Sequence, residues 1–175
     1  NGVQNERKAN NEIVVAIAQD LEDSLDPHAS AAAGTREVLF NVYEGLVKTG
    51  PNGELIPAVA EDYAISDDGL VYTFTLREGV KFHNGKEMTS ADVVASLNRW
   101  LECFGTARKM VGDARFTAVD DYTVSLTLDH SAIMLLDMLA GAAQAAAIYP
   151  VESIEAVNAD TGYVPADYII GTGPY

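Results

Sequence analysis

The sequence predicts a mixed α/β (α+β) fold, in which helices pack on a mixed sheet that is rich in β-hairpins. Residues 70–76 (LVYTFTL) alternate large apolar side chains with smaller ones at a period of two, which indicates a strand with one buried face. Asp68-Gly69 and Asn84-Gly85 are turn dipeptides of the kind that close hairpins. Residues 89–101 instead place apolar side chains on one face of a helix.

Each further element has a local reason. Residues 12–18 (EIVVAIA) form an apolar run that is typical of a buried strand, and residues 35–45 are amphipathic and end at a glycine, as helices often do. The helix after Thr89 begins with a capping-box variant, T-x-x-D. Residues 122–128 repeat the alternation of a half-buried strand, and Pro150 fits the first position of a helix.

The elements are expected in a fixed order along the chain. They are a polar leader 1–11, a strand 12–18, an acidic loop up to about 34, a helix 35–45, hairpins 46–48/54–56 and 61–65/70–76, a short hairpin around 84–85, a helix 90–103, a loop 104–112, a hairpin 115–119/122–128, a helix 131–139, a helix 151–157 and an irregular stretch 158–168. The carboxylates of the acidic loop, Asp26 among them, are interpreted as solvated.

Composition excludes several classes of function. The chain has 175 residues and a net charge of −15, which argues against nucleic acid and against an anionic membrane surface as partners. Its single cysteine, Cys103, is expected to be a buried apolar residue. No apolar run approaches the roughly 20 residues of a membrane span, and the polar start lacks the apolar run of a signal peptide.

Known catalytic and metal-binding patterns are missing from the sequence. No G-x-S-x-G elbow is present, and the three histidines lack the spacing of metal ligands. His83 lies in a predicted hairpin and is interpreted as a scaffold residue, and Trp100 is interpreted as core. We therefore expect a protein that is not an enzyme and that needs no cofactor. An enzyme using paired carboxylates such as Asp67-Asp68 remains the alternative of another class.

Several ordered motifs resemble a known family. They are LDPH 25–28, YEGL 43–46, PAVA 57–60, VKFHNG 80–85, TSADV 89–93 and GTGPY 171–175. Together they resemble the family 5 extracytoplasmic solute-binding proteins, which are the peptide and nickel receptors of ABC importers. The resemblance implies a periplasmic-binding-protein-like type II fold, of which this chain is the N-terminal part only.

The same resemblance implies a division into domains. Residues 1–11 are a flexible leader, residues 12–45 begin the main lobe, residues 46–168 form a small subdomain, and residues 169–175 are a return strand into the main lobe. The second lobe is expected to be absent from the chain. Because the sheet then has unpaired strands, we also expect a homodimer of the fragment.

The implied function is that of a substrate-binding receptor. It would capture di- or oligopeptides outside the cytoplasmic membrane, either as a periplasmic protein or as a lipid-anchored one, and deliver them to the permease subunits. The resemblance also allows a nickel chelate or an oligosaccharide as the ligand, and a sensor without transport as the role.

Three stretches are expected to contact the ligand. The first lies after the predicted first strand, the second after the long helix, where Arg108 offers donors to a carboxylate, and the third in an Ala- and Gly-rich segment that permits close backbone approach. The alternative for Arg108 is an ordinary surface arginine. The predicted contact residues are Leu21, Glu22, Asp23, Leu25, Arg108, Lys109, Met110, Ala142 and Ala143.

Overall fold

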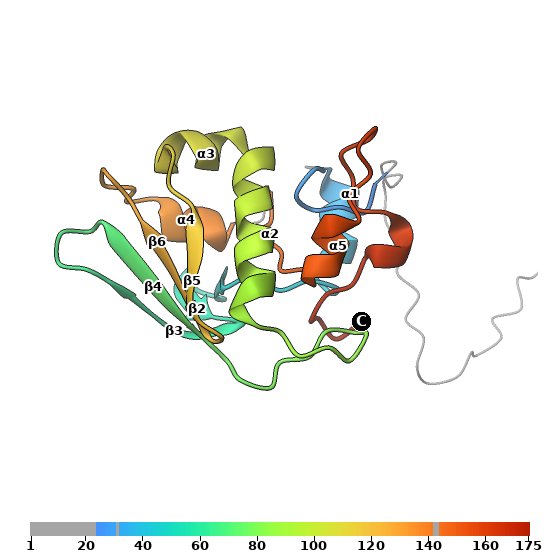
Figure 1. Cartoon of the computed structure of the whole chain (residues 1–175), viewed down its shortest axis with the longest axis horizontal. Coiled ribbons are helices and arrows are strands. Elements are labelled where there is room, and N and C mark those ends of the chain that lie inside the picture. The colour runs from blue at the N-terminus through green and yellow to red at the C-terminus, as the bar shows by residue number, and fades with distance from the viewer. Residues whose placement is uncertain (1–23, 31, 142–143) are drawn as a thin grey trace, which may run out of the picture.

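A four-stranded antiparallel sheet with one long helix across it forms the centre of the protein (Figure 1). The structure is a computed structural model that describes residues 24–30, 32–141 and 144–175. Its elements are α1 Ala33–Leu39, β1 Val47–Thr49, β2 Leu55–Pro57, β3 Ala60–Ile65, β4 Val71–Leu76, α2 Ser90–Cys103, α3 Gly105–Val111, β5 Phe116–Asp120, β6 Thr123–Thr127, α4 Leu135–Leu139, α5 Val151–Glu155 and a 3-10 helix, Ala166–Tyr168. The strand predicted at residues 12–18 lies outside the described residues.

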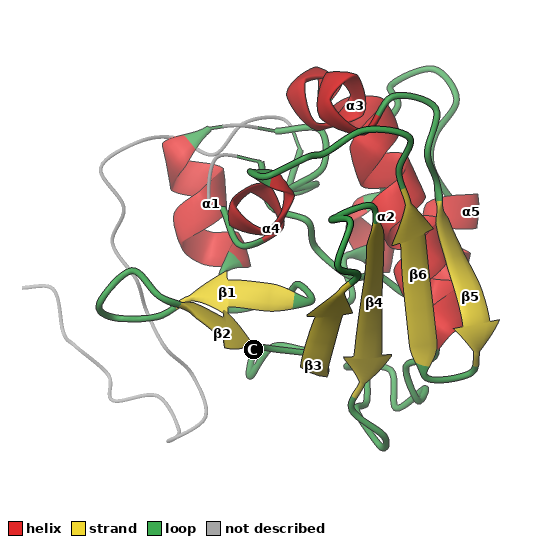
Figure 2. Ribbon diagram, turned by 90° about the vertical axis from the view of Figure 1, so that its left-hand side faces the viewer, coloured by secondary structure: helices red, strands yellow, loops and turns green. Residues whose placement is uncertain are grey.

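The predicted hairpins are confirmed, and they join into the sheet. β3 pairs with β4, so that Tyr63 lies opposite Phe74, and β5 pairs with β6. β4 and β6 then pair with each other, with Thr73 opposite Ser125, which gives the strand order β3-β4-β6-β5. β1 and β2 form a separate two-stranded hairpin, which Figure 2 shows beside the larger sheet.

The period-two pattern assigns one face of the sheet to the core. Tyr72, Phe74 and Leu76 of β4 are at most 4% exposed, while the residues between them are more accessible to solvent. α2 covers this face with Leu97 and Trp100, both fully buried. Trp100 is therefore a core residue, as predicted, and its indole N–H donates to the carbonyl of Gln144 at 2.9 Å.

A second, smaller hydrophobic cluster lies on the other side of α2. Leu39, Tyr43, Ala147, Tyr149 and Val164 are its buried members. It therefore brings the region around α1 together with the chain that precedes and follows α5. Ser96 of α2 connects the two clusters, because its hydroxyl donates to the carbonyl of Tyr149 and accepts from the Tyr149 N–H.

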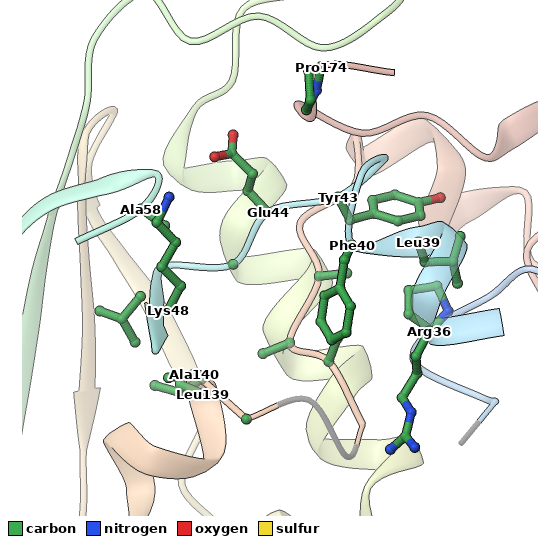
Figure 3. A pocket seen from close by; sticks show the side chains of 17 residues that line it. Arg36, Leu39, Phe40, Tyr43, Glu44, Lys48, Ala58, Leu139, Ala140 and Pro174 are labelled. Atoms are coloured by element: carbon green, nitrogen blue, oxygen red, sulfur yellow. The ribbon is translucent and has the colours of Figure 1, made fainter. Parts of the chain in front are cut away.

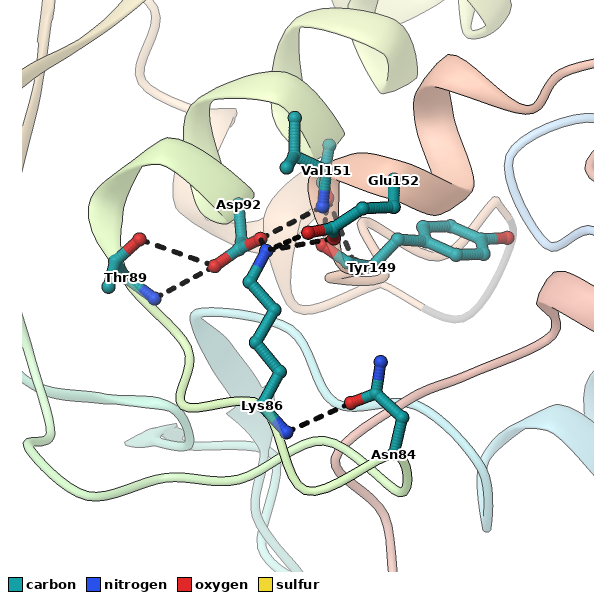
Figure 4. Close-up of polar contacts among 8 residues, drawn as sticks. Asn84, Lys86, Thr89, Asp92, Tyr149, Val151 and Glu152 are labelled. Atoms are coloured by element: carbon teal, nitrogen blue, oxygen red, sulfur yellow. Dashed lines mark hydrogen bonds and ion pairs between the residues drawn. The ribbon is translucent and has the colours of Figure 1, made fainter.

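The predicted capping box at the start of α2 is confirmed, and it does more than cap the helix. Asp92 accepts from the backbone N–H of Thr89 at 3.0 Å and from that of Val151 at 2.8 Å (Figure 4). Lys86 binds Asp92 at 2.7 Å and also reaches Glu152 at 2.8 Å. One buried carboxylate thus ties together the hairpin around residue 85, the N-terminus of α2 and the start of α5.

The helix predicted over residues 35–45 is shorter and begins earlier. α1 covers Ala33–Leu39, and the chain then leaves the helical path. The reason is that the backbone of residues 41–45 pairs with distant segments. Gly173 N–H donates to the carbonyl of Val42 at 2.9 Å, and Ile148 N–H donates to that of Glu44 at 3.0 Å. Tertiary partners therefore take the carbonyl groups that a longer helix would use.

Two expectations around the end of α2 are wrong. Residues 104–112, predicted as a loop, contain helix α3. Its residues after Gly105 include good helix formers, and Gly112, with φ of 60°, ends it. Cys103, expected to be buried, is exposed, because it is the last residue of α2 and no further turn covers it.

Smaller differences concern the last third of the chain. α4 begins at Leu135 instead of residue 131, α5 ends at Glu155, and Pro150 is the N-cap of α5 instead of its first helical residue. Residues 169–175 follow a path without regular strand structure, although their backbone pairs with residues 41–42. Within the described part of the chain, no helix combines the length and the apolar character that a membrane crossing requires.

Candidate functional site

A cavity of about 290 Å³ lies between α1, β1 and the end of α4 (Figure 3). Residues 43–45, which follow α1, line one wall, and residues 145–147, which precede α5, line another. Much of its surface is apolar: Leu39 and Tyr43 are nearly buried, and Phe40 is 54% exposed. Such a mixture of apolar walls with a few polar groups is typical of small-ligand sites.

Three charged side chains line this cavity. Glu44 is its one carboxylate among the described lining residues, and Arg36 and Lys48 are its cations. In Figure 3, Glu44 points toward the end of the cavity where Pro174 lies, and Arg36 points toward the opposite end. The cavity therefore offers charges of both signs at separate positions.

The Glu44 carboxylate is held by the motif at the end of the chain. The hydroxyl of Thr172 donates to Glu44 Oε2 at 3.0 Å. Gly171 and Gly173 flank this threonine, and a Cβ on either would collide with the backbone of residues 41–42. Both positions therefore require glycine for the close approach that brings Thr172 to Glu44.

His83 fixes the same segment from the other side. Its backbone N–H donates to the Gly171 carbonyl at 3.0 Å, and its ring Nδ1 accepts from the Gly171 N–H at 3.2 Å. The remaining ring nitrogen, Nε2, then donates to the Gly173 carbonyl at 2.8 Å. The prediction that His83 is a scaffold residue is confirmed, since three hydrogen bonds join it to the 171–173 segment.

A buried ion pair stabilises the loop that contributes Pro27 to the cavity. Asp26 is fully buried and binds the Arg99 guanidinium of α2 through both oxygens, at 2.6 and 3.1 Å. Tyr149 O–H and Val164 N–H also donate to it, at 2.8 and 3.0 Å. The interpretation of Asp26 as a solvated loop carboxylate is therefore wrong. Burial alone would raise the pKa of Asp26, but the Arg99 hydrogen bonds and charge hold this pKa below its usual value.

His28 lies beside this pair and is neutral at pH 7. Its Nε2–H donates to the carbonyl of Ala147, which lines the cavity, at 2.8 Å, and its ring packs edge-on against Tyr149 at 5.0 Å. Burial, followed by the nearby charge of Arg99, lowers the pKa of His28 from 6.5 to about 4. His28 therefore acts as a hydrogen-bond donor that positions the cavity wall.

The structure places the predicted contact residues in different regions. Leu25 packs against the smaller hydrophobic cluster. Arg108 on α3 pairs with Asp113 at 3.0 Å, Lys109 is exposed, and Met110 packs against the main core. The other predicted contacts, Leu21, Glu22, Asp23, Ala142 and Ala143, lie outside the described residues. None of the four described residues lines the cavity, although Gly141 and Ala145, on either side of the Ala142–Ala143 pair, do.

Sequence reasoning missed Arg36, Glu44 and Lys48 as a group. Glu44 lies within the YEGL motif, which was a usable signal, but its partner Thr172 is 128 residues further along the chain. Among the described residues, no group of three or more His, Cys, Asp or Glu side chains is placed to hold a metal ion.

Comparison with known proteins gives the family. The sequence profile described as bacterial extracellular solute-binding proteins, family 5 middle, matches residues 54–175. The glutathione-binding protein GsiB of Salmonella typhimurium is 33% identical over 170 residues, which cover 94% of this chain and 31% of that protein.

Two solved structures illustrate the likeness. AgaA of A. tumefaciens R10, in complex with agropinic acid, is 33% identical with a TM-score of 0.73, over 87% of this chain and 30% of that one. The periplasmic binding protein DppA of Helicobacter pylori, in complex with the peptide STSA, is 27% identical with a TM-score of 0.71, over 86% of this chain and 33% of that one. The chain thus spans about a third of the length of these relatives, and it belongs to the family 5 bacterial extracellular solute-binding proteins.

Proposed function

We propose that this chain is part of the receptor of an ABC importer, which captures peptides outside the cytoplasmic membrane and delivers them to the permease subunits. The observation that carries this proposal is the family match over residues 54–175, on a fold that leaves a cavity with apolar walls and charges of both signs. In such a receptor two lobes close over the ligand, and the closed form is the one that the permease recognises.

Peptides are the ligand class that the relatives favour. One structural relative holds the peptide STSA, and one sequence relative is named for binding glutathione, which is itself a tripeptide. The AgaA relative holds agropinic acid instead, so a second candidate ligand is a different small acid. A nickel chelate and an oligosaccharide are the remaining alternatives.

We further propose a role for each part of the chain. Residues 12–45 begin the main lobe, residues 46–168 form the subdomain that extends the cleft, and residues 169–175 lead back into the main lobe. The smaller hydrophobic cluster joins residues on both sides of this division, such as Tyr43 and Tyr149. The predicted contacts at residues 21–25, 108–110 and 142–143 remain part of this proposal, with ligand contact tested by substitution.

The location and the oligomeric state are also proposals. We propose a periplasmic or lipid-anchored protein, in line with the extracellular family to which the chain belongs. Mass spectrometry of the protein isolated from its own cells distinguishes a lipid-anchored form from a free one. The expected homodimer through unpaired strands remains a prediction, and a strict monomer in sedimentation at high concentration would contradict it.

A thermal-shift screen of the full-length protein tests the function. The probes are di- and tripeptides, longer peptides, oligosaccharides and nickel chelates. A ligand that binds only the folded state raises the melting temperature with its concentration. We expect a rise with peptides. A rise only with a sugar or a chelate would replace the ligand, and no rise with any probe would contradict the receptor assignment.

A further inference from the structure

The cavity combines one carboxylate and two cations with an apolar centre. Glu44 and Arg36 point to opposite ends in Figure 3, and the side chain of Phe40 lies between them. Leu39 and Leu139 complete the apolar surface, and both are nearly buried. A ligand that fills this space must therefore match an anionic group at one end and cationic groups elsewhere on the wall.

Glu44 is held in place before any ligand binds. Its backbone carbonyl accepts from Ile148 N–H at 3.0 Å, and its carboxylate accepts from Thr172 O–H at 3.0 Å. Thr172 in turn is fixed by the bonds between His83 and the two flanking glycines. A carboxylate that is already oriented loses little conformational entropy when it pairs with a cation, which favours binding.

The cavity size limits the ligand. Its volume of about 290 Å³ lies at the lower end of small-ligand pockets, which span about 300–1,000 Å³. Such a volume suits a molecule the size of an amino acid or a dipeptide. A neutral ligand of that size would leave the charged wall groups without partners after displacing their water, which disfavours binding.

We propose that this cavity binds a small zwitterion of amino-acid to dipeptide size, whose ammonium group pairs with Glu44 and whose carboxylate faces Lys48 and Arg36. This inference rests on the proposed function as a solute receptor and specifies one of its binding sites. The charges match in sign at each end, and the guanidinium of Arg36 presents the planar fork of donors that suits a carboxylate. The apolar wall then accommodates the body of the ligand.

Isothermal titration of the full-length protein tests this directly. The probes are the dipeptide Ala-Ala, its N-acetyl derivative and its C-terminal amide. Removing the ammonium charge deletes the pair with Glu44, and removing the carboxylate deletes the pair with the cations. Because one charged hydrogen bond is at stake in each case, we expect about tenfold weaker binding or more for both blocked probes. This series uses the unmodified protein, so it does not depend on how a variant folds.

Substitutions locate the effect in the cavity. We expect Glu44→Gln to weaken Ala-Ala binding about tenfold and to have little effect on the N-acetyl probe, and Lys48→Met to do the same for the amide. Thr172→Val should weaken Ala-Ala less, with recovery in Thr172→Ser, because Thr172 only positions the carboxylate. Glu54→Gln is the matched control, since Glu54 contacts the backbone of Asn52 in its own turn and does not line the cavity.

Each result has a definite meaning. Equal affinity for free and blocked probes, equal effects of Glu44→Gln and Glu54→Gln, or no binding of Ala-Ala by the unmodified protein would each overturn the zwitterion site. The proposed receptor function is judged separately by the thermal-shift screen. A peptide-dependent rise there, together with unchanged binding in Glu44→Gln, refutes this site alone, whereas no rise with any probe refutes both.

Discussion

Replacing Asp26 by asparagine removes the carboxylate at the centre of the buried network. Asp26 accepts from both terminal nitrogens of Arg99, from Tyr149 O–H, and from the backbone N–H groups of His28 and Val164. The Arg99 side chain is only 8% exposed, so the substitution leaves a buried cation without its partner. Removing one member of such a pair costs about 3–5 kcal/mol of unfolding free energy. For a chain of this size, that corresponds to a melting temperature about 6–20 °C lower.

Urea unfolding followed by circular dichroism measures this loss. Asp113→Asn is the matched control, because Asp113 pairs with Arg108 at 3.0 Å but is fully exposed, and exposed pairs contribute little. The double variant Asp26→Asn/Arg99→Met should lose less than the sum of its single variants, since each single variant breaks the same pair. Additive losses, or a loss in Asp26→Asn no larger than in the control, would refute the claim that this pair stabilises the loop.

Three further predictions follow from the same structure. Because burial lowers the pKa of His28 to about 4, the unfolded chain binds a proton on this ring between pH 6.5 and 4 and the folded chain does not. Stability should therefore be complete above pH 6.5 and fall by about 3 kcal/mol toward pH 4, and urea titrations at a series of pH values should show a flatter profile for His28→Gln. Gly171→Ala should destabilise by at least about 1–3 kcal/mol through its backbone collision, whereas Gly105→Ala, with nothing within 4 Å, should be neutral or slightly stabilising by the same assay. Lys86→Met should lower the unfolding free energy by about 1.5–3 kcal/mol, because a buried carboxylate loses its charged donor, and an unchanged denaturation midpoint would contradict this reading of Figure 4.

Local patterns predicted the hairpins and the long helix well. The alternation in residues 70–76 and 122–128 reports which face is buried, and this depends only on neighbours in the same strand. The T-x-x-D cap of α2 is local in the same way. By contrast, the end of α1 was misplaced because tertiary hydrogen bonds to residues 41–45 override a continuous helical pattern. α3 was missed because Gly105 and the charges after it resemble a loop when the packing is unknown.

The site was less predictable, because distant residues form it. Asp26 and Arg99 are 73 residues apart, and no local pattern distinguishes this aspartate from the other acids of its loop. The glycines of the GTGPY motif could be recognised as a family resemblance, yet the reason for them, close approach to the backbone of residues 41–42, is visible only in three dimensions. The cavity charges likewise come from α1, from β1 and from the chain between them.

The carboxylate of Asp92 has a consequence for how the fold opens. The first turn of a helix usually frays before the rest, because its backbone N–H groups lack partners inside the helix. Here the same carboxylate that caps α2 also binds the N–H of Val151 and the ammonium group of Lys86. The α2 terminus cannot open without also releasing α5 and the hairpin around residue 85. These three segments, far apart in sequence, are therefore coupled into one cooperative unit, which protects the chain from local opening at what would otherwise be its weakest helix end.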